Sequence, residues 1–121
     1  MPAIMEGYAD DCELVSPGYR IVRGKAGVEA SFQHLFKIFG NMAVQIEDVL
    51  IEHEALDRVA YMSTVTATHL GEVLGFPGTG RRLSFKGVIM LSFKDGRIAT
   101  ERRLYDLTEV LLQIDGVSRI H

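Results

Sequence analysis

The spacing of apolar residues changes along the chain, and each change predicts a new structural element. Between Lys25 and Phe39, apolar side chains recur at helical spacing while polar side chains occupy the opposite side, which predicts an amphipathic helix. Gly40 and Asn41 follow and supply a stop signal. The apolar stripe consists of Val28, Phe32, Leu35, Phe36 and Phe39.

After this helix the apolar period falls to two, which predicts strands. The expected strands cover residues 42–52, 58–73, 82–94 and 97–105. In the first of them the alternation slips near Glu47 and Asp48, and this slip predicts a bulge or a bend. The glycine-rich segment from Gly75 to Gly80 is expected to be a loop.

The last two strands are joined by Lys94-Asp95-Gly96-Arg97, and an Asp-Gly pair between alternating apolar residues predicts a tight hairpin. Extending that turn pairs Ile89 with Arg102 and Phe85 with Asp106. One face of the hairpin is then expected to be buried, and it carries Leu83, Phe85, Ile89, Leu91, Phe93, Ile98 and Leu104. The other face, with Lys86, Met90, Glu101 and Arg103 on it, suits solvent or a subunit interface.

Beyond Tyr105 the helical spacing returns in Val110, Leu111 and Ile114, and Asp106 to Glu109 has the form of a capping box. Segregated helices and strands with a hairpin predict an α+β fold, in which helices pack on one side of an antiparallel sheet. The 121 residues suffice for one domain, 1–121.

Composition excludes several classes of protein. The net charge of −3 argues against a nucleic-acid partner, and no stretch reaches the roughly 20 apolar residues that a membrane helix requires. The start of the chain lacks the features of a signal peptide. A single cysteine, Cys12, cannot form an internal disulfide, so a cytoplasmic location is the default expectation.

The hairpin register places two charged residues, Arg102 and Asp106, on the face that should be buried. Such charges are costly unless they are paired or face a wet cavity. Asp106 has two interpretations, which are compatible with each other: the N-cap of the last helix, or a general acid/base whose pKa is tuned by burial. Arg102 either extends its guanidinium to solvent or binds a substrate group or a carboxylate. A bulge at Gly87 would overturn this inference, because one extra residue reverses every face beyond it.

His69 stands near the end of the long strand beside a loop, which makes it the next acid/base candidate, although an isolated histidine is more often structural. The sequence has no C-x-x-C or H-E-x-x-H motif and no Walker or Rossmann glycine spacing. Neither a metal site nor a nucleotide cofactor is therefore expected.

Three segments resemble the SnoaL-like polyketide cyclases of the nuclear transport factor 2-like superfamily. They are Tyr8 to Leu14, similar to a Y-A-D-D-x-x-L opening; Thr68 to Arg82, similar to T-H-x-G-x-x-x-G-x-P-P-T-G-[KR]; and Asp95 to Asp106, similar to D-G-[KR]-I-x-x-E…Y-D. The resemblance implies a cone-shaped, strongly curved sheet around a pocket, and a homodimer. It also implies cofactor-independent ring closure with an aspartate near the end of the last strand as acid/base group, a position that Asp106 matches.

Two departures from the family pattern affect these expectations. Few residues precede Tyr8, so the usual N-terminal helix is expected to be shortened and the pocket opened or closed by a partner. Gly78 replaces the second proline of P-P-T-G and is expected to loosen the loop.

Three hypotheses follow from the sequence. The first is a cofactor-independent enzyme on a small hydrophobic carbonyl compound, with Asp106 and His69 catalytic and Arg102, Phe85, Ile89 and Leu104 binding substrate. Cyclase, isomerase and dehydratase chemistry all fit this arrangement. The second is a non-catalytic module for ligand binding or dimerisation, in which Asp106 is only a cap. The third is a structural protein whose cone is filled by side chains.

Overall fold

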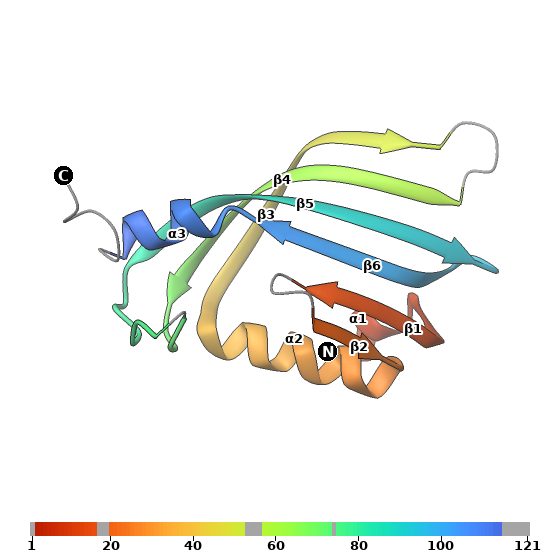
Figure 1. Cartoon of the computed structure of the whole chain (residues 1–121), viewed down its shortest axis with the longest axis horizontal. Coiled ribbons are helices and arrows are strands. Elements are labelled where there is room, and N and C mark those ends of the chain that lie inside the picture. Colours follow the sequence, from red (N-terminus) through yellow and green to blue (C-terminus); the bar gives the residue numbers. More distant parts are fainter. Residues whose placement is uncertain (1, 17–19, 53–56, 74, 115–121) are drawn as a thin grey trace.

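A single curved, six-stranded sheet carries the helices of the protein (Figure 1). The computed structural model describes residues 2–16, 20–52, 57–73 and 75–114. Along the chain the elements are α1 (Pro2–Met5), β1 (Tyr8–Ser16), β2 (Arg20–Arg23), α2 (Lys25–Ile38), β3 (Phe39–Ile51), β4 (Arg58–His69), β5 (Arg82–Lys94), β6 (Arg97–Tyr105) and α3 (Leu107–Gln113). None of the helices in these residues is long and apolar enough to cross a membrane.

The strand order is β2-β1-β6-β5-β4-β3, and the sheet is curved and does not close into a barrel (Figure 1). All neighbouring strands are antiparallel except β1 and β6, which run parallel. The cone-shaped α+β fold expected from the sequence is therefore confirmed, with the α1 helix reduced to four residues. The sheet is mixed rather than purely antiparallel, because the first long strand lies beside the last one.

Most element boundaries agree with the apolar pattern. The helix α2 ends one residue before the predicted limit, and β5 and β6 have the predicted bounds. The predicted slip in β3 is confirmed by a shift in its pairing with β4 between Ile46 and Asp48. The strand β4 ends at His69, four residues before the predicted Val73.

The loop after β4 packs more closely than expected. A Cβ atom on Gly78 would lie 2.0 Å from the carbonyl oxygen of Leu70, so a proline or any other side chain would collide with that backbone. Gly78 therefore allows the loop to lie against Leu70 and Gly71. The expectation that this glycine loosens the loop is wrong.

The helix α3 covers the part of β5 that extends beyond the end of β6. The Asp106 carboxylate caps α3 by accepting the backbone N–H of Glu109 at 3.0 Å, which confirms the predicted N-cap. The Glu109 side chain does not complete the capping box, since its carboxylate accepts the backbone N–H of Lys86 at 3.0 Å. The Gln113 amide bonds to the backbone N–H and carbonyl of Ser84, and these contacts satisfy the free edge of β5.

The pairing of β5 with β6 corrects the predicted hairpin faces. Phe93 pairs with Ile98 as expected, but Ser92 then pairs with Thr100, so Ala99 is an extra residue in β6. Beyond this bulge every side chain of β6 points to the face opposite the predicted one. The expected burial of Arg102, Leu104 and Asp106 is wrong: all three are exposed, Leu104 by 62%. Glu101 and Arg103 are the buried pair, each 5% exposed.

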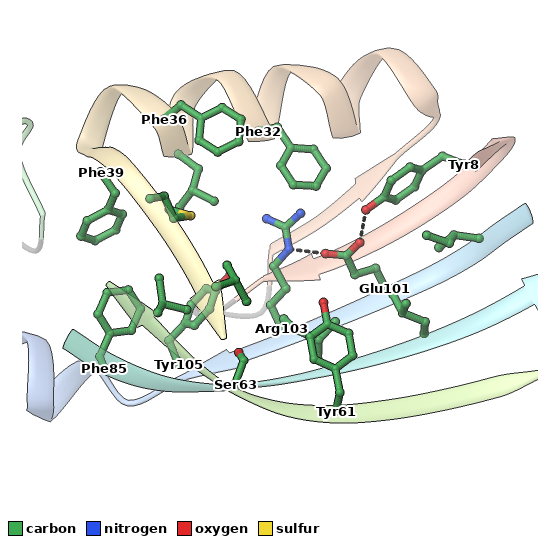
Figure 2. A pocket seen from close by; sticks show the side chains of 17 residues that line it. Tyr8, Phe32, Phe36, Phe39, Tyr61, Ser63, Phe85, Glu101, Arg103 and Tyr105 are labelled. Atoms are coloured by element: carbon green, nitrogen blue, oxygen red, sulfur yellow. Dashed lines mark hydrogen bonds and ion pairs between the residues drawn. The ribbon is translucent and has the colours of Figure 1, made fainter. Parts of the chain in front are cut away.

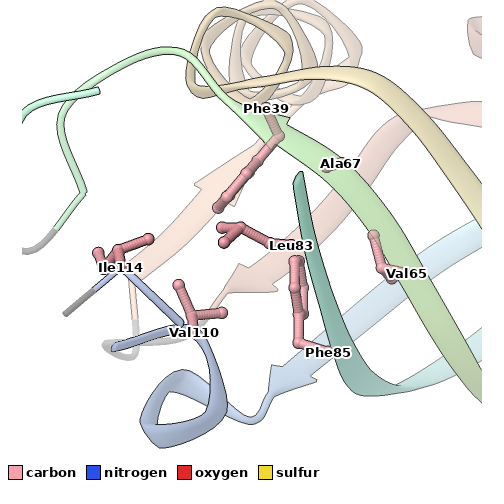
Figure 3. Packing of buried hydrophobic residues seen from close by; sticks show 7 residues of the cluster. All are labelled: Phe39, Val65, Ala67, Leu83, Phe85, Val110 and Ile114. Carbon is pink, nitrogen blue, oxygen red and sulfur yellow. The ribbon is translucent and has the colours of Figure 1, made fainter. Parts of the chain in front are cut away.

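The concave face of the sheet holds two clusters of buried apolar side chains. The first cluster, called the filled end below, lies under α3 (Figure 3) and consists of Phe39, Val65, Ala67, Leu83, Phe85, Val110 and Ile114. The second cluster lies where α2 meets β1 and consists of Met5, Tyr8, Cys12, Leu14 and Val28. Burial raises the pKa of the Cys12 thiol, so this cysteine is a structural core residue.

Candidate functional site

Between the two clusters the concave face is hollow. A pocket of about 390 Å³ lies between α2 and the sheet (Figure 2). The predicted apolar stripe of α2 supplies its roof through Phe32, Leu35 and Phe36. The strands supply its floor, mainly with apolar and aromatic side chains: Phe39, Met42, Val44, Val65, Phe85, Ile89, Leu91 and Ile98. The helix and the sheet thus enclose an apolar volume that suits a small hydrophobic molecule.

One end of this pocket carries a buried ion pair. Glu101 and Arg103 are two residues apart on β6, so both point to the concave face. The Nε atom of Arg103 donates a hydrogen bond to the Glu101 carboxylate, and the Tyr8 hydroxyl donates to its other oxygen (Figure 2). The Arg103 guanidinium also lies over the Phe32 ring, 4.3 Å from its centroid. These residues form the polar end of the pocket, which is held in place by strand β6, strand β1 and helix α2.

Electrostatics fix the protonation of this polar end. Burial is the largest single effect on Arg103 and lowers its pKa, but the charge of Glu101, its hydrogen bond and the neighbouring phenols together raise the pKa, so the guanidinium stays charged. The pKa of Tyr8 is raised by burial and by the charge of Glu101. The pKa values of Tyr61 and Tyr105, which also line the pocket, are raised mainly by burial. All three phenols therefore remain hydrogen-bond donors at neutral pH.

The available chemistry follows from these groups. A carboxylate can accept or return a proton, and a guanidinium and phenols can stabilise negative charge that develops on a substrate oxygen. Glu101 supplies the carboxylate and Arg103 the guanidinium among the described residues that line the pocket. No group of three or more His, Cys, Asp or Glu side chains in the described ranges is placed to hold a metal ion.

The predicted site residues divide between the pocket and other places. Phe85 and Ile89 line the pocket, as expected for substrate-binding residues. Arg102 and Leu104 lie on the opposite, convex face of the sheet, because the bulge at Ala99 reverses their orientation. Sequence reasoning missed Glu101 and Arg103 as site residues. The one available signal was the alternation Glu101, Arg103, Tyr105, whose phase fits the buried face only if a bulge precedes it.

Asp106 lies outside the pocket in this structure. Its side chain is exposed, and its carboxylate is engaged in capping α3, while its backbone N–H donates to the carbonyl of Lys86. The pocket-lining residue next to it is Tyr105. Its predicted capping role is confirmed, and its catalytic role stays a prediction.

His69 is completely buried and lies away from the pocket lining. Its Nδ1 atom accepts the backbone N–H of Thr79 at 3.3 Å and lies 3.0 Å from the Thr79 hydroxyl. Because a backbone N–H can only donate, Nδ1 is the acceptor and the ring proton of the neutral histidine is on Nε2. His69 thus holds the loop after β4 against the sheet, and its acid/base role stays a prediction.

The sequence profile of the SnoaL-like polyketide cyclases matches residues 1–114. A protein of Jannaschia sp. CCS1, described as a candidate SnoaL-like polyketide cyclase, is 25% identical with a TM-score of 0.81 over 90% of this chain and 74% of that chain. No curated protein matches the sequence.

Two proteins of Streptomyces are similarly related. AclR of Streptomyces galilaeus, described as a candidate hydroxylase, is 27% identical with a TM-score of 0.76 over 93% of this chain and 72% of that chain. IdmH of Streptomyces antibioticus, described as a candidate polyketide cyclase, is 25% identical with a TM-score of 0.75 over 91% of this chain and 83% of that chain. The descriptions of these two neighbours differ, so the shared fold leaves the reaction open.

Proposed function

Since the chain belongs to the SnoaL-like polyketide cyclase family, we propose that it is a cofactor-independent acid/base enzyme acting on a small hydrophobic carbonyl compound. The observation that carries this proposal is the apolar pocket with one buried Glu101–Arg103 pair at its end. The walls are mainly apolar, and a fixed ion pair offers both proton transfer and charge stabilisation.

The proposed reaction begins with removal of a proton from the carbon next to the carbonyl group. The base takes the proton, and the electron pair of the C–H bond becomes an enolate. In ring closure the enolate carbon attacks a second carbonyl of the same molecule, and the alkoxide that forms takes up the proton. In isomerisation a different carbon of the enolate takes up the proton. Neither reaction requires a cofactor, since the proton that the base removes is returned to the product.

Three residues compete for the role of base. Glu101 ranks first because its carboxylate lines the pocket, and each of its oxygens has a further lone pair besides the hydrogen bond it accepts. Asp106 and His69 remain candidates from the sequence and the family resemblance. For either to act, its side chain would have to leave the contacts it makes to the backbone of Glu109 or Thr79.

A second candidate function is non-catalytic binding of a hydrophobic ligand. It is favoured by the hydrogen bonds that already occupy both carboxylate oxygens of Glu101 and by the capping role of Asp106. In that case the pocket binds a ligand without exchanging its protons.

Proton exchange separates these two functions. We expect the protein to speed the exchange of the methyl protons of 2-acetylnaphthalene in D₂O, followed by proton NMR. Glu101→Gln should slow the catalysed exchange by about 10²–10⁴-fold, while Asp106→Asn and His69→Gln retain it. Circular dichroism and thermal unfolding establish that each variant is folded, and the exposed hairpin variant Arg97→Met serves as the matched surface control.

Each outcome has a distinct meaning. If Asp106→Asn or His69→Gln loses the exchange while Glu101→Gln retains it, the residue changed in that variant is the base. A wild-type protein that binds the ketone but never exchanges its protons is a binding module, and the catalytic proposal is then wrong.

We also propose that the protein is a cytoplasmic homodimer, paired through the convex face of the sheet. Apolar side chains that lie near one another there are strongly exposed in the single chain, namely Leu50, Met62, Met90 and Leu104. An exposed apolar patch of this kind is typical of an interface between subunits. Light scattering coupled to gel filtration should give a dimer that Met90→Lys converts to a monomer, whereas a wild-type monomer contradicts the proposal.

A further inference from the structure

The Arg103 guanidinium has hydrogen-bonding capacity that the described part of the protein leaves unused. Its Nε atom donates to Glu101, but its Nη2 atom is buried and has no partner among the described residues. The whole side chain is nine-tenths or more buried and belongs to the pocket lining. In Figure 2 the guanidinium lies between Glu101 and the α2 residue Phe32, with its terminal nitrogens turned away from the carboxylate. A buried donor without a partner is unfavourable, so an acceptor is expected to complete the site.

The pocket itself offers little for Arg103 to donate to. The Glu101 carboxylate is shared between Tyr8 and the Nε atom of Arg103. The Ser63 hydroxyl, also in the lining, donates to the carbonyl of Gly87. Tyr61 and Tyr105 bring further hydroxyl donors to the same pocket. None of these groups accepts a hydrogen bond from Nη2 in the structure, so we expect the missing acceptor to come from the ligand.

The charges at the site indicate whether the hydrogen-bond acceptor on the ligand is charged or neutral. The Glu101–Arg103 pair is neutral as a whole, and both side chains are almost entirely removed from solvent. A ligand carboxylate would place a second negative charge beside one positive charge in an apolar pocket, which is strongly unfavourable. An uncharged carbonyl oxygen accepts the same hydrogen bond and leaves the balance unchanged.

We propose that Arg103 is the carbonyl-binding residue of the pocket and that it selects an uncharged hydrophobic ketone over a carboxylate of the same shape. The inference rests on the proposed function, to which it adds a residue and a substrate class. The ketone oxygen lies at the polar end and the hydrocarbon body extends toward Phe39 and Phe85, which line the opposite end (Figure 2). Arg103 thereby stands at the oxygen on which negative charge would develop in an enolate.

Three probes of closely similar shape test this proposal: 2-acetylnaphthalene, 2-ethylnaphthalene and 2-naphthoate. Their affinities for the protein are measured by fluorescence titration at pH 7. The ketone should bind about 10- to 100-fold more tightly than the hydrocarbon, as expected for one hydrogen bond from a charged donor. The carboxylate should bind more weakly than the ketone.

The decisive variant has to remove the guanidinium without leaving Glu101 unpaired. The double variant Glu101→Gln/Arg103→Met does so, and it should lose most of the preference for the ketone over the hydrocarbon. Arg103→Lys keeps the positive charge but lacks the planar fork of donors that lets the guanidinium bond to Glu101 with one nitrogen and turn another away from it, so it should also lose most of the preference. Arg97→Met, an exposed change at the other end of β6, should bind like the wild type.

Infrared spectroscopy gives a readout that a purely structural role for Arg103 would not move. The carbonyl stretch of bound 2-acetylnaphthalene should shift to lower frequency in the wild type and return toward its value in an apolar solvent in the double variant. An unshifted stretch in the wild type overturns the proposal. So does a ketone preference that survives in the double variant, or tighter binding of 2-naphthoate than of the ketone.

The same measurements separate this inference from the proposed function. If the hydrocarbon and the ketone bind equally well, the pocket is a hydrophobic binding site and only the role of Arg103 is wrong. If neither the ketone nor the hydrocarbon binds, the proposed ligand class of the pocket fails together with the inference.

Discussion

The two ends of the concave face differ although one sheet builds both. At the filled end, α3 follows the edge of β5 and inserts Val110 and Ile114 among the side chains of the sheet (Figure 3). At the pocket between the two clusters, called the hollow end below, α2 spans the sheet, and Phe32 and Phe36 roof the pocket without filling it. Amphipathic helices alone therefore do not decide whether a curved sheet is filled.

The two ends also treat buried polar groups differently. Beside the filled end, His69 pairs with Phe39 across the sheet, is fully buried and holds the neighbouring loop through Thr79. In the hollow end, the Glu101–Arg103 pair is held by Tyr8 and Phe32 and borders open volume. A buried ion pair is a costly way to stabilise a core, so its position beside a pocket favours a role in ligand binding.

Among variants that test this difference between the two ends, breaking the Glu101–Arg103 ion pair is expected to change the free energy of unfolding most. Arg103→Met leaves the Glu101 charge buried without a cation and should lower the free energy of unfolding by about 3–5 kcal/mol. Equilibrium urea unfolding followed by circular dichroism measures the change. The double variant Glu101→Gln/Arg103→Met should recover most of the loss, and equal destabilisation by the single and double variants would show that the charge is not the cause.

A somewhat smaller effect is expected from emptying the filled end. Leu83→Ala removes a side chain that is 1% exposed and closely surrounded, and should cost about 2–5 kcal/mol in urea unfolding. Leu91→Ala on the same strand lies at the pocket and is only partly buried, so it should cost clearly less. Equal losses at the two positions would mean that the hollow end is as tightly packed as the filled one.

The smallest effect is expected at the start of α3. Asp106→Ala removes the N-cap and should cost about 0.5–2 kcal/mol, whereas Asp106→Asn should be nearly neutral because asparagine also caps well. Thermal unfolding of both variants measures the difference. A large loss of stability in Asp106→Asn would indicate that the charge of the carboxylate does more than cap the helix.

The sequence by itself determined the elements from Lys25 onward and much of the fold, whereas the strands β1 and β2 were not predicted. The helical stripe from Val28 to Phe39, the Asp95-Gly96 turn and the slip near Glu47 each depend on neighbouring residues, and each is found as predicted. Local patterns of this kind are readable because they repeat within a few residues. The predicted locations of Phe85 and Ile89 at the pocket follow from the same alternation.

The identity of the buried charges was decided only by the tertiary structure. The alternation predicted two charged residues on the core face of β6, and such a pair is present, but it is Glu101 with Arg103 instead of Arg102 with Asp106. The physical reason is that side chains in a strand alternate with a period of two, so the single extra residue Ala99 exchanges the two faces. No local pattern marks that bulge. The pair that it turns inward contacts Tyr8 and Phe32, which come from β1 and α2, far away in the sequence.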